Sequence, residues 1–291
     1  CEKYVPYGEH IQKQPKKKKS EFIQFEEHKN TKQLAYSLDE FKEGDLCYIT
    51  HKLHGTSGRT TYTLREKELP LKWYEKLFRR KPRVVREYAV ATGTRRTVLN
   101  FDNGVADNRF RKKYHDLLAP KLKKGETIYY EIVGYVAKDS PIMPVYDNKK
   151  INDEAFVKKY GDTTTFTYGC KNGENDIYAY RMTFTSEEGF VLEYSQADLE
   201  KRCKQMGIKV VPVLDKFIFT SKEDLLARVN KYQLAPDILD PTHINEGVVV
   251  RVERGLELKL YKSKNIYFKI LEGIAKEDAL QPDMEEMEGL K

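Results

Sequence analysis

Apolar and polar residues alternate along much of the chain beyond residue 45, which is the pattern of half-buried strands. The alternating stretches are rich in β-branched and aromatic residues, which favour strands. They predict strands over 46–53, 59–64, 86–91, 127–135, 177–184, 208–214, 247–252 and 256–262. Because these strands outnumber the helical segments and do not alternate strictly with them, we predict an α+β domain of antiparallel sheets flanked by helices.

Helical spacing of apolar residues predicts helices over 108–122, 195–207 and 221–232. Ser195 and Ser221 are expected N-caps, because a serine hydroxyl can accept a hydrogen bond from the first helical turn. Gly207 is expected to end the helix that Ser195 begins. The stretch 145–176 contains many turn-forming residues, so we predict a surface excursion between strands there.

The ends of the chain differ in composition from its middle. Residues 1–33 are polar and rich in lysine, and they predict a basic, flexible or peripheral N-terminal arm. The acidic residues 271–291 predict a C-terminal helix or linker stub, which leaves 34–270 for the folded domain. We expect no membrane partner, because no apolar run approaches the roughly 20 residues of a membrane-spanning helix. The N-terminus also lacks the apolar core of a secretory signal.

Charge is distributed unevenly along the chain. Residues 1–150 carry 32 basic and 20 acidic side chains, a net charge of +12, whereas residues 151–291 carry 20 and 25, a net charge of −5. The basic clusters of the first half indicate a polyanionic partner. The cysteines form no CxxC pair, which argues against a zinc site and favours a reducing, intracellular setting. They are Cys1, Cys47, Cys170 and Cys203.

The segment HKLHGTSGR, residues 51–59, is the first candidate for chemistry. Lys52 ends an apolar strand, where a lysine is costly to bury unless it is neutral or paired. Gly55 and Gly58 would let the backbone approach a ligand closely, and the cation of Arg59 would favour the neutral amine that a nucleophile needs. The alternative is a strand-end lysine that extends into water.

Later segments offer further candidates. Glu131 interrupts the apolar strand TIYYEIVGY, and Glu246 precedes the strand GVVV, so each needs a partner and could instead form a structural ion pair. Lys262 and Lys264 are two residues apart and share a strand face, which suits a phosphate. Tyr178 and Tyr180, in IYAYRMTF, share a strand face; one of them could stack on a nucleobase, or both could pack in the core.

Six segments in order resemble the successive motifs of the covalent nucleotidyltransferase superfamily: KLHGTSGR, TGTRRTVL, IYYEIVGY, IYAYRMTF, NEGVVVR and LYKSKNIYF. Over about residues 45–270 the chain is most similar to ATP-dependent RNA ligases of the T4 RNA ligase 2-like type. The resemblance implies an ATP-grasp-like nucleotidyltransferase fold, with an adenylyltransferase domain at 34–270. It also implies joining of 5′-phosphate and 3′-hydroxyl RNA ends through lysyl-AMP and AMP-capped RNA.

The resemblance implies ATP and Mg²⁺ or Mn²⁺ as cofactors, and we expect a monomer. It makes Lys52 the residue that attacks the α-phosphate, places Glu131 at the ribose and Tyr180 on the adenine, and assigns Glu246 to the metal. The residues expected to bind the nucleotide are His54, Gly55, Arg59, Arg96, Glu131, Tyr180, Glu246, Lys262 and Lys264. Those expected to contact RNA are Arg79, Arg80, Lys81 and Arg95.

The sequence departs from the family pattern at three places. The arginines of TGTRRTVL follow Lys52 by about 40 residues, with the basic stretch KWYEKLFRRKPRVVREY between them, so we expect this loop to be an extra RNA-contacting hairpin. Arg181 stands where an acidic residue usually follows the stacking aromatic residue. The chain ends soon after the last motif, so we expect it to lack the further C-terminal domain that many relatives use to bind RNA.

Three alternatives stay open at this point. Two are enzymes of the same superfamily, an ATP-dependent DNA ligase and an mRNA capping guanylyltransferase. The third is a non-catalytic nucleic-acid-binding module. The joint presence of Lys52, Glu131, Glu246, Lys262 and Lys264 favours an enzyme, because a pure binder of polyanions has no need of carboxylates that face its ligand.

Overall fold

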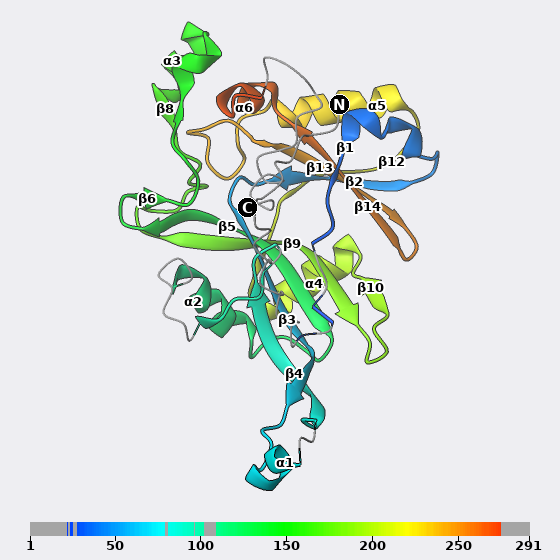
Figure 1. Ribbon diagram of the computed structural model, residues 1–291. Helices are drawn as coiled ribbons and strands as arrows, with labels where there is room; N and C mark the ends of the chain where they lie inside the picture. The colour runs from blue at the N-terminus through cyan, green and yellow to red at the C-terminus, as the bar shows by residue number, and fades with distance from the viewer. Residues whose placement is uncertain are drawn as a thin grey trace, which may run out of the picture.

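The computed structural model describes residues 22, 24–25, 28–78, 81–95, 97–101 and 109–274. It contains two large sheets, and Figure 1 shows them one above the other with the chain crossing between them. Most neighbouring strands are antiparallel, so the predicted α+β class with antiparallel sheets is confirmed.

The five-stranded sheet has the strand order β1-β14-β13-β2-β12. Its strands are β1 (Lys32–Gln33), β14 (Glu257–Lys264), β13 (Gly247–Arg254), β2 (Leu46–Lys52) and β12 (Val213–Ile218). Helix α5 (Lys222–Gln233) covers the outer face, where Leu225 and Val229 pack in one cluster with valines of β13. Because these apolar side chains pack against α5, the opposite face of β2 and β13 is the one that faces the second sheet.

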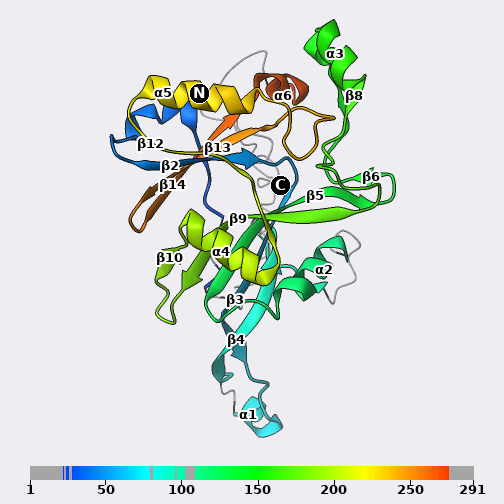
Figure 2. The same cartoon turned by 180° about the vertical axis from the view of Figure 1, so that it is seen from behind.

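The second sheet has the order β10-β9-β5-β3-β4, with β11 beside β9 and β6 beside β5. Its strands are β10 (Val191–Glu193), β9 (Asn175–Thr185), β5 (Glu126–Ala137), β3 (Thr56–Glu68), β4 (Val84–Gly93), β11 (Lys209–Val210) and β6 (Ser140–Pro141). Helices α2 (Arg109–Leu118) and α4 (Gln196–Met206) pack on its outer face (Figure 2). Leu118 and Leu199 are fully buried there against Ile128 and Ile132 of β5.

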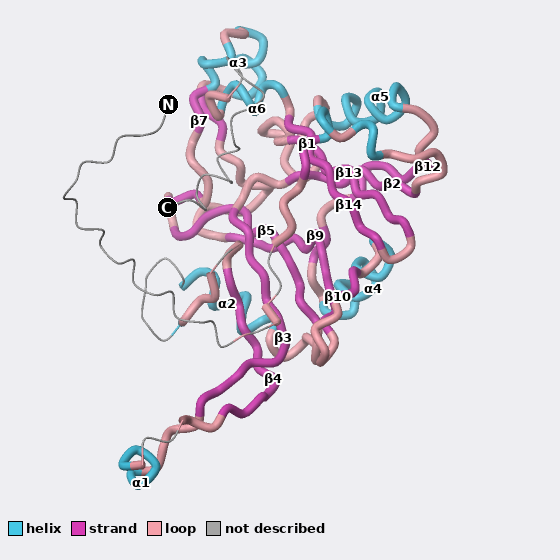
Figure 3. Tube along the Cα trace, turned by 45° about the vertical axis from the view of Figure 1, so that its right-hand side comes forward, coloured by secondary structure: helices cyan, strands magenta, loops and turns pink. Residues whose placement is uncertain are grey.

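Smaller elements extend this framework. A third apolar cluster joins the excursion after β6 to the end of the described chain, and it contains β7 (Tyr146–Asp147), α3 (Glu154–Tyr160), β8 (Thr163–Thr164) and α6 (Ile266–Leu271). Helix α1 (Trp73–Leu77) lies at the tip of the long β3–β4 hairpin, whose far end extends beyond the rest of the second sheet (Figure 3).

Local signals predicted the helix ends correctly. The Ser195 hydroxyl accepts a hydrogen bond from the Asp198 N–H, and the Ser221 hydroxyl accepts one from the Asp224 N–H. Gly207 ends α4 in the left-handed conformation, with φ 65°. These ends depend on contacts within one helical turn, which a sequence carries directly.

Predictions that depended on pairing were less accurate. The single strand predicted over 208–214 is wrong, because β11 pairs with β9 and β12 pairs with β2 in the other sheet. Pro212 lies between them, and proline lacks the N–H that a continuous ladder needs. The excursion at 145–176 contains helix α3, which begins at the Asp153 side-chain cap.

Part of the predicted N-terminal arm is built into the fold. β1 pairs in parallel with β14, and His28 and Lys29 contact Tyr180 and Glu193 in the second sheet. Residues 28–33 of the predicted arm therefore contact both sheets. Residues 1–21 and 275–291, which include most of the predicted arm and the predicted C-terminal stub, lie outside the described residues.

Candidate active site

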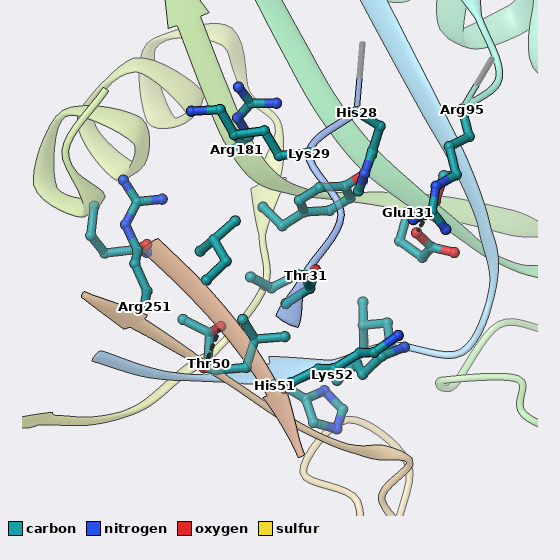
Figure 4. Close-up of a pocket in the computed structure, with 18 residues that line it drawn as sticks. His28, Lys29, Thr31, Thr50, His51, Lys52, Arg95, Glu131, Arg181 and Arg251 are labelled. Atoms are coloured by element: carbon teal, nitrogen blue, oxygen red, sulfur yellow. Dashed lines mark hydrogen bonds between the residues drawn. The ribbon is translucent and has the colours of Figure 1, made fainter. Parts of the chain in front are cut away.

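A pocket of about 890 Å³, including its open mouth, lies between the inner faces of the two sheets (Figure 4). Among the predicted site residues, the pocket is lined by Lys52, Arg95, Glu131, Tyr180 and Lys262. These residues come from β2, the segment after β4, β5, β9 and β14, so the two sheets together bring distant motifs to one place.

Lys52 is the last residue of β2 and pairs in register with Gly247 at the start of β13. Its Nζ donates a hydrogen bond to Oε1 of Glu246, 2.6 Å away, and its side chain is only 11% exposed. Lys264 Nζ is 3.7 Å from the same oxygen and 2.9 Å from Oε2 of Glu272. The fully buried Glu246 carboxylate therefore lies between two ammonium groups, and the alternative in which Lys52 extends into water is wrong.

Lys262 and Lys264 have different surroundings although both lie in β14. Lys262 lines the pocket and pairs in register with Val249 of β13. Lys264 does not line the pocket, since its ammonium group contacts the two glutamates beside it. Of these two lysines, Lys262 is thus the one placed to touch a ligand in the pocket.

The opposite wall carries Glu131 and Tyr180. Glu131 pairs in register with Ser57 of β3, and the Ser57 hydroxyl donates a hydrogen bond to Glu131 Oε2 at 3.1 Å. Tyr180 Oη lies 2.6 Å from Nε2 of His28, so the N-terminal segment contacts the tyrosine side chain at the pocket wall. Both residues face the same space as Lys52, as the motif resemblance implied.

A β-bulge changes the direction of side chains in β9. Tyr129 pairs with Arg181 and Tyr130 pairs with Ala179, which leaves Tyr180 as the extra residue. Successive strand residues normally point to opposite faces, but a bulge re-aims them. As a result Tyr180 and Arg181 both line the pocket.

Two buried arginines at the pocket were not predicted as site residues. Arg181 donates hydrogen bonds to both carboxylate oxygens of Glu193, at 2.9 and 2.6 Å. Burial alone would lower the pKa of Arg181 and raise that of Glu193. The hydrogen bonds and opposite charges between them hold the pKa of Arg181 above its ordinary value and that of Glu193 below. Arg251 of β13 donates to Oε1 of Glu253 at 2.7 Å. The sequence offered one signal for Arg181, because an arginine stands after Tyr180 where the family usually has an acidic residue.

Three residues of the segment 53–59 that we expected at the nucleotide do not line the pocket. His54 is buried among aromatic rings, where Nε2 lies 2.8 Å from Oη of Tyr146. Arg59 lies over the ring of Phe25, 3.8 Å from its centroid. At Gly55 a Cβ atom would lie 2.3 Å from the carbonyl oxygen of Ile132, so this glycine is explained by close strand packing. These residues shape the turn after Lys52.

The residues expected to contact RNA are spread out. Arg95 lines the pocket and donates a hydrogen bond to Asn30 Oδ1 at 2.5 Å. Lys81 is exposed near the tip of the β3–β4 hairpin and does not line the pocket. Arg79, Arg80 and Arg96 lie outside the described residues.

No cluster of three or more His, Cys, Asp or Glu side chains that could hold a metal ion occurs in the described part of the chain. A divalent ion near Glu246 would therefore take most of its ligands from phosphate and water, as Mg²⁺ commonly does. The described cysteines Cys47, Cys170 and Cys203 are free thiols. Within the described ranges, the helices are too short or too polar to cross a membrane.

Comparisons with known proteins identify the family and the fold. The family model for RNA ligases matches residues 45–270. A comparison with curated proteins finds no match. The solved structure of Naegleria gruberi RNA ligase with pyrophosphate is similar, with 15% identity, a TM-score of 0.50, and coverage of 83% of this chain and 57% of that one. A variant of that enzyme with AMP and manganese has 14% identity, a TM-score of 0.51, and coverage of 86% and 61%.

This chain thus spans less than two thirds of the length of those structures. At such low identity the structural likeness establishes the nucleotidyltransferase-type fold, and the family model covers most of the sequence. The protein belongs to the RNA ligase family.

Proposed function

We propose that this protein is an ATP-dependent RNA ligase of the T4 RNA ligase 2-like type. It would join 5′-phosphate and 3′-hydroxyl RNA ends through lysyl-AMP and AMP-capped RNA. The observation that carries this proposal is the position of Lys52, which is held by Glu246 at a pocket that also contains Tyr180 and Lys262. The similar Naegleria structures, which contain ATP or AMP with manganese, support the choice of ligand.

In the first step Lys52 Nζ attacks the α-phosphorus of ATP. A nitrogen–phosphorus bond forms and the bond to pyrophosphate breaks. The ammonium group gives up two protons to water or to the departing pyrophosphate, and the nitrogen keeps one hydrogen. Glu246 orients the amine, since its Oε1 is 2.6 Å from Nζ. Lys264 Nζ lies 3.7 Å from the same oxygen, so the carboxylate that orients Lys52 is shared with a second ammonium group. Lys262 lines the pocket and stabilises the charge that develops on the phosphate.

The nucleoside is bound by the second sheet. Tyr180 stacks on the base, and stacking on an aromatic ring contributes about 1–3 kcal/mol. Glu131, held by the Ser57 hydroxyl, accepts a hydrogen bond from the ribose. Val249 lines the pocket from the five-stranded sheet and offers the base an apolar contact.

A hard divalent cation in the pocket would have the Glu131 carboxylate as its protein ligand and the nucleotide phosphates and water as most of the others, because the predicted metal ligand Glu246 is fully buried between Lys52 and Lys264. Mg²⁺ or Mn²⁺ would then neutralise the pyrophosphate leaving group. In the later steps AMP passes to the 5′-phosphate of RNA, and a 3′-hydroxyl displaces it. The net charge of +12 in residues 1–150, with Arg95 at the pocket, supplies contacts to the RNA backbone.

The decisive test is transfer of label from α-labelled ATP to the protein. Lys52→Arg keeps the positive charge beside Glu246 but cannot act as the nucleophile, so it should abolish labelling. Lys209→Arg is the matched control, because Lys209 pairs with Asp176 outside the pocket. Retention of label in the Lys52 variant would overturn the assignment.

The same assay separates the remaining alternatives. Labelling by GTP in place of ATP would indicate a capping guanylyltransferase, and sealing of nicked DNA but not of nicked RNA would indicate a DNA ligase. Absence of label with every nucleotide would indicate a binding module. AMP-capped RNA and sealed RNA, scored separately, report the second and third steps.

A further inference from the structure

Arg181 and Arg251 lie on the side of the pocket away from Lys52 (Figure 4). Each is only 2% exposed. We propose that these two arginines form a donor site that binds ring nitrogens of the nucleotide base. The proposal rests on the proposed function, because it assumes a nucleotide whose α-phosphate lies at Lys52.

In each of the two guanidinium groups, two nitrogens donate hydrogen bonds and the third does not. Arg181 uses Nε and Nη2 for Glu193, and Arg251 uses Nε for Glu253 and Nη2 for the carbonyl oxygen of Tyr194. Among the described residues, no acceptor lies within hydrogen-bonding distance of Nη1 of either arginine. A buried charged donor without an acceptor is unfavourable, and arginine has no acceptor atom of its own. These nitrogens therefore suit a ligand that presents acceptors.

The two arginines are tied to the same short segment of chain. Glu193 and Tyr194, which receive their hydrogen bonds, are consecutive residues. The ammonium group of Lys29 also contacts Glu193, at 2.8 Å. This anchoring places both guanidinium groups at one end of the pocket and restricts their movement.

Strand register places this end at a suitable distance from Lys52. Lys52 pairs with Gly247, Thr50 pairs with Val249, and Arg251 is two residues beyond Val249 on β13. Four residues of strand separate Gly247 from Arg251, which is about 13 Å at the rise of a β-strand. A nucleotide that runs along β13 from Lys52 thus has its base beside Val249 and the far edge of that base toward Arg251.

In the second sheet, too, an arginine lies beyond the residue that would contact the face of the base. Arg181 directly follows Tyr180, and the bulge opposite Tyr129 turns both into the pocket. The Arg181 guanidinium also lies over the Tyr129 ring, 4.4 Å from its centroid, which holds its plane in position. A base stacked on Tyr180 therefore has Arg181 at its edge.

Charge favours a base over a phosphate at this end. Glu193 and Glu253 offset most of the charge of the arginines, whereas Lys52 and Lys262 already provide cations for phosphate elsewhere in the pocket. Ring nitrogens N1, N3 and N7 of adenine are neutral acceptors that match the N–H donors. Because donors cannot bind the exocyclic amino group of adenine, the site reads the ring nitrogens.

The test compares ATP with 1-deaza-, 3-deaza- and 7-deaza-ATP as donors of label to the full chain. For the unaltered protein, at least one analogue should raise the concentration for half-maximal labelling about tenfold, since a hydrogen bond to a charged donor is lost. The maximal rate should change little. Equal use of all three analogues and ATP would overturn the proposal. Absence of label even with ATP would instead overturn the proposed function.

Variants supply a second measurement. Arg181→Lys and Arg251→Lys keep the charge but lose the planar fork, so each should raise the half-maximal ATP concentration and reduce the penalty of the sensitive analogue. Arg202→Lys is the matched control, because Arg202 binds Glu126 by two hydrogen bonds but does not line the pocket. An unchanged penalty in both lysine variants contradicts the assignment, and if they fail to fold, the analogue series on the unaltered chain decides.

Discussion

Replacement of Gly55 by alanine should disable the site without unfolding the protein. A Cβ atom at this position would lie 2.3 Å from the carbonyl oxygen of Ile132, 3.0 Å from Cγ1 of Val133 and 3.1 Å from Cγ of Glu131. Ordinary contacts begin near 3.4 Å, so the turn after Lys52 and strand β5 must separate by about 1 Å. That separation moves the two walls of the pocket apart.

The expected magnitudes follow from this displacement. Overpacking of this kind lowers the free energy of unfolding by about 1–3 kcal/mol, which urea unfolding measures. Misplacement of reacting groups by 1 Å slows catalysis by about a hundredfold. The rate of lysyl-AMP formation at saturating ATP should therefore fall by about that factor, while the variant remains folded.

Gly255→Ala is the matched control. Gly255 has φ +61° at the turn between β13 and β14, and nothing lies within 4 Å of a Cβ atom built there. Its replacement costs about 1–2 kcal/mol of backbone strain but leaves the pocket walls in place. If Gly55→Ala labels as fast as the unaltered protein, or slows no more than Gly255→Ala, the packing argument is refuted.

Three further predictions concern single side chains. Tyr180→Ala should raise the ATP concentration for half-maximal labelling at least about tenfold, whereas Tyr180→Phe should change it less than about threefold; equal effects would refute stacking. Glu246→Gln should lower the free energy of unfolding in urea by about 3 kcal/mol, because two buried ammonium groups lose their shared carboxylate. A loss under about 1 kcal/mol would contradict this. Burial opposes ionisation of Asp240, but hydrogen bonds from Thr242 and Thr167 hold its pKa at about 2. Asp240→Asn should lower the free energy of unfolding by about 2 kcal/mol at pH 7. The difference from the unaltered protein should shrink as the pH falls from 4 to 2, because a carboxyl group with a lowered pKa stabilises the folded state only while it is ionised. A difference independent of pH would refute the electrostatic account.

Several features could be predicted because their causes are local. Alternation with a period of two located most strands, and Ser195, Ser221 and Gly207 marked helix ends through contacts within a single turn. The order of the motifs singled out Lys52, Glu131, Tyr180 and Lys262, which all line one pocket. Each of these signals lies within a short stretch of chain.

Other features could not be predicted, because they depend on partners far away in sequence. The orientation of Arg181 depends on the bulge opposite Tyr129, which exists only once β9 pairs with β5. Burial of His54 depends on Tyr146 and Phe268, and the position of residues 28–33 depends on β14. No local pattern encodes these pairings.

The sequence by itself determined the class of fold, most of the strands that carry the motifs and the lysine that we propose as the nucleophile. Only the tertiary structure decided which side chains face the pocket, since the direction of a side chain depends on strand register and on what covers each face of a sheet. For this reason Lys264 and His54 are buried beside the pocket, while the two unforeseen arginines, Arg181 and Arg251, line it.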